Sequence, residues 1–107
     1  MALADKLPLL KTLLLLIPPG KVTTYGDLAR VLGTSPRNVG RLLALNDEAP
    51  QVPCHRVVGS DGSLVGYSGP GGIEFKRRLL ELEGVGFDER GRVRREYFVS
   101  LSKTLME

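Results

Sequence analysis

The feature that most restricts how this chain can fold is a pair of helix start signals separated by a glycine stop. Thr24 stands three residues before Asp27, a spacing that resembles a capping box and predicts a short helix from Tyr25 to Leu32. Gly33 follows directly, and glycine commonly ends a helix because it tolerates the left-handed conformation. The first short helix is therefore delimited on both sides by local signals.

A second start signal follows this stop. Ser35 is a preferred N-cap residue and Pro36 is favoured in a first helical turn, so we expect a helix from Pro36 to about Leu45. Two short helices joined by a tight turn indicate a helix-turn-helix, whose second helix meets DNA. Arg37 and Arg41 are four residues apart and share one face of that helix. An ordinary solvated arginine face explains the same pattern equally well.

Three further elements complete the predicted fold. Apolar spacing predicts a first helix from about Asp5 to Ile17 and a last helix from about Gly72 to Glu83, and residues 86–99 read as a hairpin around Glu89-Arg90-Gly91. We expect one domain over residues 1–107, mainly α with small β elements and winged helix-turn-helix-like. The apolar positions of the last predicted helix are Ile73, Leu79, Leu80 and Leu82.

Composition limits the function classes. The net charge of +3 and the pI near 9.3 favour a polyanionic partner without identifying it. A single cysteine excludes an internal disulfide framework, and the apolar run Leu13 to Ile17 is too short to span a bilayer. We therefore expect an intracellular protein, cytoplasmic and nucleoid-associated or nuclear, that does not bind a membrane.

Cys54 is the residue with the clearest chemical potential, although a lone cysteine is more often a buried apolar residue. His55 beside it is a candidate base, and Arg56 adds positive charge that would favour the thiolate. If the segment is extended, neighbouring side chains point to opposite sides, so a water could bridge Cys54 and His55. One cysteine and one histidine leave a tetrahedral zinc site two ligands short, so no metal or other cofactor is expected.

The run Pro53-Cys54-His55-Arg56-Val57-Val58 resembles the active-site signature of the O6-alkylguanine-DNA alkyltransferases, also called methylated-DNA–protein-cysteine methyltransferases. The similarity extends from about Leu7 to Gly84 and fits the family's C-terminal DNA-binding and active-site domain. Its further motifs, in order, are Gly20 to Ala29, Arg37 to Arg41, Asn46, Gly66 to Gly69 and Lys76 to Gly84.

The resemblance implies a single-turnover DNA-repair enzyme that transfers an alkyl group, such as methyl, from O6-alkylguanine to Cys54. Glu83, His55 and a water would draw the proton from the thiol, and Asn46 would brace the loop. Tyr25 would donate a proton or hydrogen bond to guanine N3 as the base leaves. The transfer product is a thioether, which thiol exchange cannot reverse.

The same resemblance implies that the protein binds double-stranded DNA through the minor groove as a monomer and flips the damaged base out of the duplex. Arg37 would fill the vacated place in the stack. The implied DNA contacts are Thr24, Tyr25, Arg37, Asn38 and Arg41. Val57, Tyr67 and Ser68 would hold the base.

Two departures from the family pattern leave other functions open. We expect the family's N-terminal domain to be absent, and the loop Ser68 to Gly72 is longer than usual. The alkyltransferase-like proteins are equally short, but they replace the cysteine, bind the lesion without transfer and recruit excision repair. A winged-helix regulator without lesion chemistry is the remaining alternative.

Overall fold

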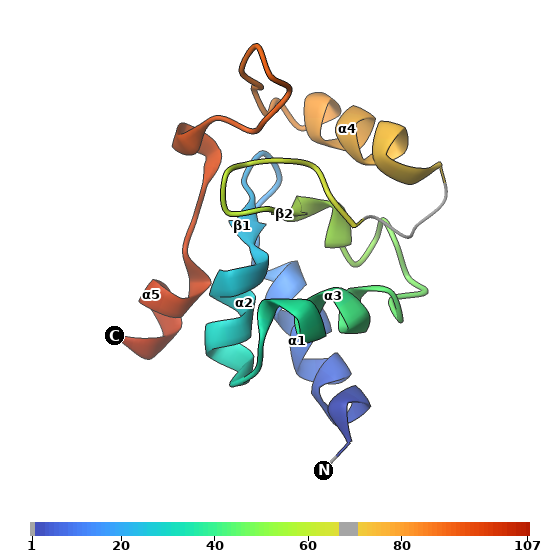
Figure 1. Ribbon diagram of the computed structural model, residues 1–107, viewed down its shortest axis with the longest axis vertical. Coiled ribbons are helices and arrows are strands. Elements are labelled where there is room, and N and C mark those ends of the chain that lie inside the picture. The colour runs from blue at the N-terminus through green and yellow to red at the C-terminus, as the bar shows by residue number, and fades with distance from the viewer. Residues whose placement is uncertain (1, 67–70) are drawn as a thin grey trace.

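The computed structural model of the chain describes residues 2–66 and 71–107 (Figure 1). The α-helices are α1 (Leu7–Leu15), α2 (Tyr25–Leu32), α3 (Pro36–Leu43), α4 (Gly72–Leu82) and α5 (Leu101–Met106). The short elements are the 3₁₀ helices η1 (Leu3–Lys6), η2 (Cys54–Arg56) and η3 (Arg95–Tyr97), and the strands β1 (Thr23–Thr24) and β2 (Val57–Val58).

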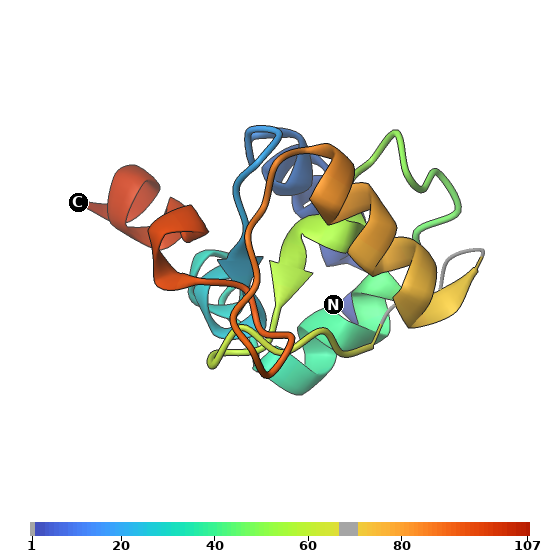
Figure 2. The same ribbon diagram turned by 90° about the horizontal axis from the view of Figure 1, so that it is seen from above.

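The two strands form a parallel pair in which Thr23 lies opposite Val57. Figure 1 shows α1, α2 and α3 gathered on one side of this pair and α4 on the other. Seen from above, α5 and α4 lie on opposite sides of the molecule (Figure 2). The expected class, mainly α with small β elements, is confirmed.

The helix-turn-helix is confirmed together with its capping residues. The Thr24 hydroxyl accepts a hydrogen bond from the backbone N–H of Asp27 at 3.0 Å, and α2 ends at Gly33, whose φ is 68°. Ser35 caps α3 by accepting from the N–H of Asn38 at 3.2 Å. These contacts are local, which explains why the sequence predicted both start points; α3 ends at Leu43, two residues before the predicted end.

The core consists of two clusters that meet at β2. Val57 packs with the apolar faces of α1, α2 and α3, whereas Val58 packs in a second cluster with Leu80 and Val93. Both strand residues are fully buried. Because successive strand residues point to opposite faces, two adjacent valines join the helix-turn-helix to the α4 side of the molecule.

Three predicted elements needed correction. The α-helical part of the first helix starts at Leu7, because Pro8 fits only in a first turn, and ends at Leu15. In α4, Leu80 is buried but Ile73 and Leu82 are 42% and 84% exposed, so the predicted apolar face was wrong at these two positions.

The third correction concerns the predicted hairpin. Residues 86–99 contain the expected turn, and its arms are joined by the bridge of Phe87 with Val93 and by backbone bonds from Asp88 N–H to the Arg92 carbonyl and from Arg94 N–H to the Gly86 carbonyl. This pairing is too short to form a strand. The returning arm forms η3 and then pairs Phe98 with Val22. The Asp88 carboxylate accepts hydrogen bonds from the backbone N–H groups of Arg90 and Arg92, and these bonds hold the turn.

Asp27 fixes the C-terminal helix, which the sequence did not predict. Its carboxylate accepts hydrogen bonds from the hydroxyls of Ser100 and Ser102, both at 2.7 Å, and from the N–H of Leu101 at 2.7 Å. Burial raises the pKa of Asp27, but bonds from Ser102, Ser100, Thr23 and Leu101 outweigh burial and hold the pKa below its ordinary value. The ionised carboxylate therefore joins α2 to α5.

We expect Asp27→Asn to lower the free energy of unfolding by about 2 kcal/mol at neutral pH, because several hydrogen bonds lose their charged acceptor. A lowered folded-state pKa gives stability that is present above the unfolded pKa and lost below it. The difference between wild type and variant should therefore shrink as pH falls below about 4. Urea unfolding at several pH values measures this. Asp47→Asn, whose side chain is 87% exposed, is the control and should change little; equal stability of Asp27→Asn and wild type would contradict the assignment.

Candidate functional site

Cys54 lies in a tight turn and not in an extended segment. η2 is held by the bonds from Arg56 N–H to the Pro53 carbonyl, 3.1 Å, and from Val57 N–H to the Cys54 carbonyl. Cys54 and His55 are 7% and 2% exposed. Among the described residues no hydrogen bond joins the two side chains directly.

The carboxylate of Glu83, at the C-cap of α4, is the centre of the hydrogen-bond network around this turn. It accepts from His55 Nε2 at 2.8 Å, from Arg56 Nη2 at 2.7 Å and from the Gly20 N–H at 3.1 Å. The side chain is 16% exposed, although its place in a last helical turn suggested a solvated residue. The structure thus brings together Glu83 and His55, as the sequence comparison implied.

Arg56 does not have the environment that its sequence position suggested. Its guanidinium binds the Glu83 carboxylate and also donates to the Ile17 carbonyl at 2.8 Å. Its charge is therefore neutralised by Glu83 and is not directed to the thiol. The expectation that Arg56 favours the Cys54 thiolate is corrected on this ground.

The protonation pattern makes His55 a neutral base. Burial raises the pKa of Glu83, but hydrogen bonds from Arg56, His55 and Gly20 overcome burial and lower it to about 2, so Glu83 is ionised. An ionised carboxylate accepts only, which places the proton of His55 on Nε2. Burial lowers the pKa of His55, and its Nδ1 has no hydrogen-bond partner in the described part of the chain. Nδ1 is therefore an unused proton acceptor.

Cys54 is held close to a brace formed by Asn46. The Asn46 amide donates to the Val52 carbonyl at 3.0 Å, and its oxygen accepts from the Glu48 N–H at 3.0 Å. Burial raises the pKa of the Cys54 thiol, while a hydrogen bond with Asn46 and the positive charge of Lys76 oppose that rise. Asn46 thus fixes the loop before Cys54, in the position that the resemblance implied.

Lys76 is the site residue that the sequence did not identify. It is 1% exposed, and its Nζ donates to the carbonyls of Val57 at 2.6 Å and Val65 at 2.9 Å. Burial lowers its pKa to about 8. The only signal was its position four residues before Leu80, on the buried row of α4, where an apolar residue would be usual.

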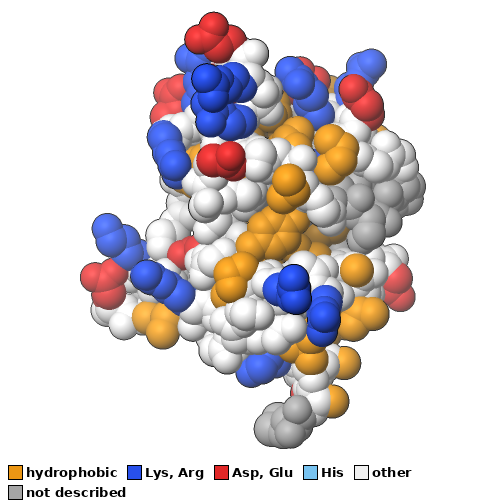
Figure 3. All heavy atoms as spheres, viewed as in Figure 1, with side chains coloured by type: hydrophobic (Ala, Val, Ile, Leu, Met, Phe, Trp, Pro, Cys, Tyr) orange, Lys and Arg blue, Asp and Glu red, His pale blue; other side chains and the backbone are white. Residues whose placement is uncertain are grey.

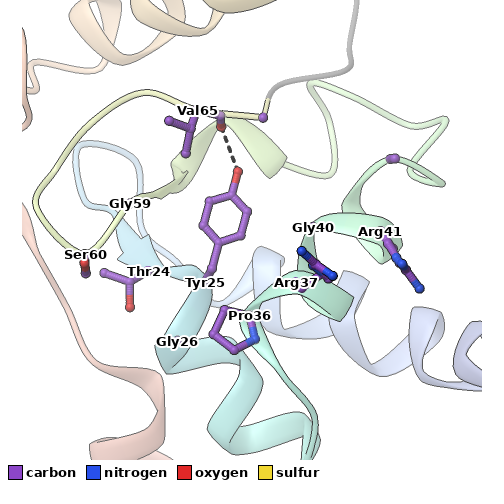
Figure 4. A pocket seen from close by; sticks show the side chains of 12 residues that line it. Thr24, Tyr25, Gly26, Pro36, Arg37, Gly40, Arg41, Gly59, Ser60 and Val65 are labelled. Atoms are coloured by element: carbon purple, nitrogen blue, oxygen red, sulfur yellow. Dashed lines mark hydrogen bonds between the residues drawn. The ribbon is translucent and has the colours of Figure 1, made fainter.

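A cavity of about 760 Å³ lies beside this network, between α2, α3 and the segment after β2. Its lining includes Tyr25, Arg37, Arg41 and Val65, and Figure 4 shows the Tyr25 ring pointing to Val65, with the two arginines on α3. The Tyr25 hydroxyl donates to the Val65 carbonyl at 2.7 Å. On the same face, hydrophobic side chains form a central patch beside Lys and Arg side chains (Figure 3).

Tyr25 connects this cavity with the buried cysteine. Cys54 does not line the cavity, but Tyr25 does, and Tyr25 also packs against the core cluster that contains Cys54. Burial raises the pKa of Tyr25, and the charge of a Cys54 thiolate raises it further. Tyr25 is therefore a neutral hydroxyl between the opening and the thiol.

The remaining candidate residues have different positions. Thr24 lines the cavity, whereas the Asn38 amide turns to the Thr34 hydroxyl at 3.0 Å and does not line it. Val57 is fully buried, and its carbonyl accepts from Lys76. Tyr67 and Ser68 lie outside the described residues.

No group of three or more His, Cys, Asp or Glu side chains within residues 2–66 and 71–107 is placed to hold a metal ion. Among the helices that the structure describes, none has the length and apolar character needed to cross a membrane.

Comparison with known proteins gives a consistent family match. The family model described as "6-O-methylguanine DNA methyltransferase, DNA binding domain" matches residues 10–85. A methylated-DNA–protein-cysteine methyltransferase of Pyrobaculum aerophilum is 59% identical over 71 residues, which are 66% of this chain and 47% of that protein. The corresponding protein of Saccharolobus solfataricus is 52% identical over 73 residues, 68% of this chain and 46% of that protein. The chain thus spans about half the length of these relatives.

Solved structures show the same fold. Atl1 of S. pombe, in complex with damaged DNA containing O6-carboxymethylguanine, aligns with a TM-score of 0.77 and 29% identity over 94% of this chain and 99% of that one. OGT of Mycobacterium tuberculosis, in complex with DNA, aligns with a TM-score of 0.68 and 44% identity over 74% of this chain and 49% of that one.

The carboxylate at the centre of the network gives a direct prediction. We expect Glu83→Gln to lower the pKa of His55 further, because the charge and hydrogen bond of Glu83 raise that pKa. The same change should lower the free energy of unfolding by about 2 kcal/mol, since Arg56 loses its buried partner. Nitrogen NMR of the imidazole and urea unfolding measure the two effects. Glu81→Gln, exposed on the same helix, is the matched control; an unchanged His55 titration in Glu83→Gln would refute the coupling.

Proposed function

Because the chain belongs to the family of 6-O-methylguanine DNA methyltransferase DNA-binding domains, we propose that it transfers an alkyl group from O6-alkylguanine in DNA to Cys54. The observation that supports this most strongly is the 2.8 Å contact of His55 Nε2 with Glu83, which leaves Nδ1 as a free acceptor in the residue that follows the only cysteine. A structural cysteine needs no oriented base. This arrangement is the one that an activated thiol requires.

The chemistry balances without a further reactant. The proton of the Cys54 thiol passes through one water to His55 Nδ1, and Glu83 stabilises the resulting imidazolium. An electron pair of the Cys54 thiolate then forms a bond to the alkyl carbon while the bond from that carbon to O6 breaks. The electron pair of that bond leaves with the guanine, and the proton held by the imidazolium passes through water to the guanine, so that His55 is neutral again. The products are an S-alkyl Cys54 and an unmodified guanine, so each molecule reacts once.

The cavity between α2 and α3 is the proposed entrance for the base. α3 enters the minor groove, and Arg37 occupies the gap that the flipped nucleotide leaves. Arg41 and Thr24, at the rim, face the phosphates, and Asn38 supports the turn before α3. The exposed arginines supply the salt-dependent part of DNA affinity, while minor-groove contact gives little sequence discrimination.

Tyr25 is the proposed gate residue between DNA and thiol. Its hydroxyl exchanges the Val65 carbonyl for N3 of the incoming guanine and donates to N3 as the leaving base gains electrons. Its raised pKa keeps the hydroxyl protonated for this donation. Backbone groups of Cys54 and Val57, with Tyr67 and Ser68, complete the proposed base pocket.

Binding without transfer is the second candidate function, because S. pombe Atl1 matches nearly the whole length of both chains. In this case Cys54 would be a vestige, and the lesion would be passed to excision repair. Cys54 and the base prepared beside it favour transfer.

The mass of the intact protein tests the proposal. After incubation with a duplex that contains O6-methylguanine, we expect a gain of one methyl in place of the thiol proton in the wild type and none in Cys54→Ser. A hydroxyl ionises far less readily than a thiol, so transfer should stop in the variant, while its DNA-binding residues are unchanged and it should still bind the duplex. Guanine at the same position is the control substrate. Tight binding of the lesion by the wild type without a mass change would establish the binding function instead.

Arg37 separates base flipping from chemistry. Arg37→Ala should slow transfer from duplex DNA by about tenfold or more. Flipping the base costs a few kcal/mol of lost stacking, and the Arg37 side chain in the vacated position offsets part of that cost. Transfer from free O6-benzylguanine, which needs no flipping, should remain nearly unchanged. Single-turnover rates on both substrates measure this, with Arg78→Ala on α4 as the control. Equal losses on both substrates would assign Arg37 to the fold or the pocket.

A further inference from the structure

Lys76 is a buried cation that the mechanism above does not use. It is one of three consecutive basic residues of α4, of which Arg78 is exposed and Arg77 half-buried, whereas Lys76 is 1% exposed. α4 packs against η2, the turn that contains Cys54 and His55. Lysine is almost never fully buried without a compensating partner, so its burial here requires an explanation.

The described hydrogen bonds of Lys76 fix the position of its ammonium group but do not neutralise its charge. Nζ donates to the carbonyls of Val57, three residues after Cys54, and of Val65, the residue that also accepts from Tyr25. Both acceptors are neutral. None of the ion pairs formed within the described residues involves Lys76. The ammonium group therefore lies in a low-dielectric region without a carboxylate beside it.

The groups around Cys54 leave Lys76 as the uncompensated cation. Tyr25 on α2 is a neutral hydroxyl, and Asn46 contributes an amide. In η2, His55 is neutral and Arg56 is paired with Glu83 from the end of α4. Among these neighbours only Lys76 brings a net positive charge to the thiol. The same charge also disfavours protonation of His55, which keeps that base neutral.

We propose that Lys76 is the counter-charge of the Cys54 thiolate and a positioning residue for the base pocket. The interaction is reciprocal: the ammonium group stabilises the thiolate, and the thiolate compensates the buried ammonium. When the thiol proton leaves, the pair becomes an ion pair in a region that water does not reach, where Coulomb attraction is strong. Its two carbonyl bonds fix β2 and the segment of Val65 around the nucleophile. The role of this pair in catalysis rests on the proposed function, whereas the electrostatic interaction between Lys76 and Cys54 does not.

The thiolate titration of Cys54 tests the pair without any alkylguanine. Iodoacetamide alkylates the thiolate form, so the pH dependence of its second-order rate reports ionisation of the only cysteine. Lys76→Met, which keeps the length and removes the charge, should move the inflection upward by about one pH unit and slow the reaction at neutral pH about tenfold. The plateau at high pH should stay the same, because the thiolate itself is intact. Arg78→Met, two residues further along the same helix, controls for net charge and should leave the inflection in place.

A second measurement holds even if Lys76→Met does not fold. The ¹³Cε signal of Lys76 reports its ionisation, and we expect a higher midpoint in the wild type than in Cys54→Ser, which cannot form a thiolate. Equal midpoints, or an unmoved Cys54 inflection in folded Lys76→Met, would overturn the proposal. If both shifts occur but O6-methylguanine yields no methylated protein, the proposed function fails and the ion pair stands.

Discussion

The Glu83 carboxylate is the interaction on which the rest of this structure depends. It accepts from Gly20 after α1, and from His55 and Arg56 in η2, while itself lying at the end of α4. Three segments far apart in the sequence are thereby joined at one ionised group. Since a buried carboxylate is stable only when its oxygens are satisfied, the three partners are constrained together. The tautomer of His55, and with it the availability of a base near Cys54, follows from this constraint.

The same network explains why a small chain tolerates so many buried polar groups. His55, Lys76 and most of Glu83 are withdrawn from water in a chain of 107 residues, whose core can offset little loss. Hydrogen bonds account for nearly all of their polar atoms, and within the described residues His55 Nδ1 is the unpartnered buried side-chain atom. Orphaned buried atoms are rare because each costs roughly 1–3 kcal/mol. An atom left in this state beside a thiol is more readily explained by chemistry than by folding.

What the sequence could predict follows from the range of the interactions. Thr24, Gly33 and Ser35 act on residues within four positions, so the start points of α2 and α3 and the end of α2 were predicted correctly. α5 was missed although Ser100 caps it locally, because six residues are too few to show a helical period, and the Asp27 carboxylate that binds its first turn lies more than seventy residues away. Lys76 was missed for the same reason: its partners are carbonyls of β2 and of the segment after it, and periodicity alone expects an apolar residue there. Cys54 and His55 were candidates from the sequence itself, but the role of Glu83 was available only through resemblance, since no local pattern links residues 28 positions apart.

In the proposed transfer, burial of the Cys54 thiol and openness of the cavity between α2 and α3 are two requirements that Tyr25 reconciles. A thiol that is 7% exposed is protected from oxidation and from stray electrophiles, but it cannot meet a substrate without a local rearrangement. Tyr25 lines the cavity on one side and packs against the cluster of Cys54 on the other, and its hydroxyl bonds the Val65 carbonyl. Lys76 donates a second hydrogen bond to the same carbonyl. Val65 therefore keeps one hydrogen bond when the hydroxyl of Tyr25 changes partner. Moving the Tyr25 hydroxyl away from Val65 therefore breaks one neutral hydrogen bond, which costs on the order of 1 kcal/mol. In the proposed transfer, an acceptor atom of the incoming purine replaces the lost bond. In the proposed transfer, the Tyr25 hydroxyl changes its partner, while the hydrogen bonds of Glu83 and Lys76 remain unchanged.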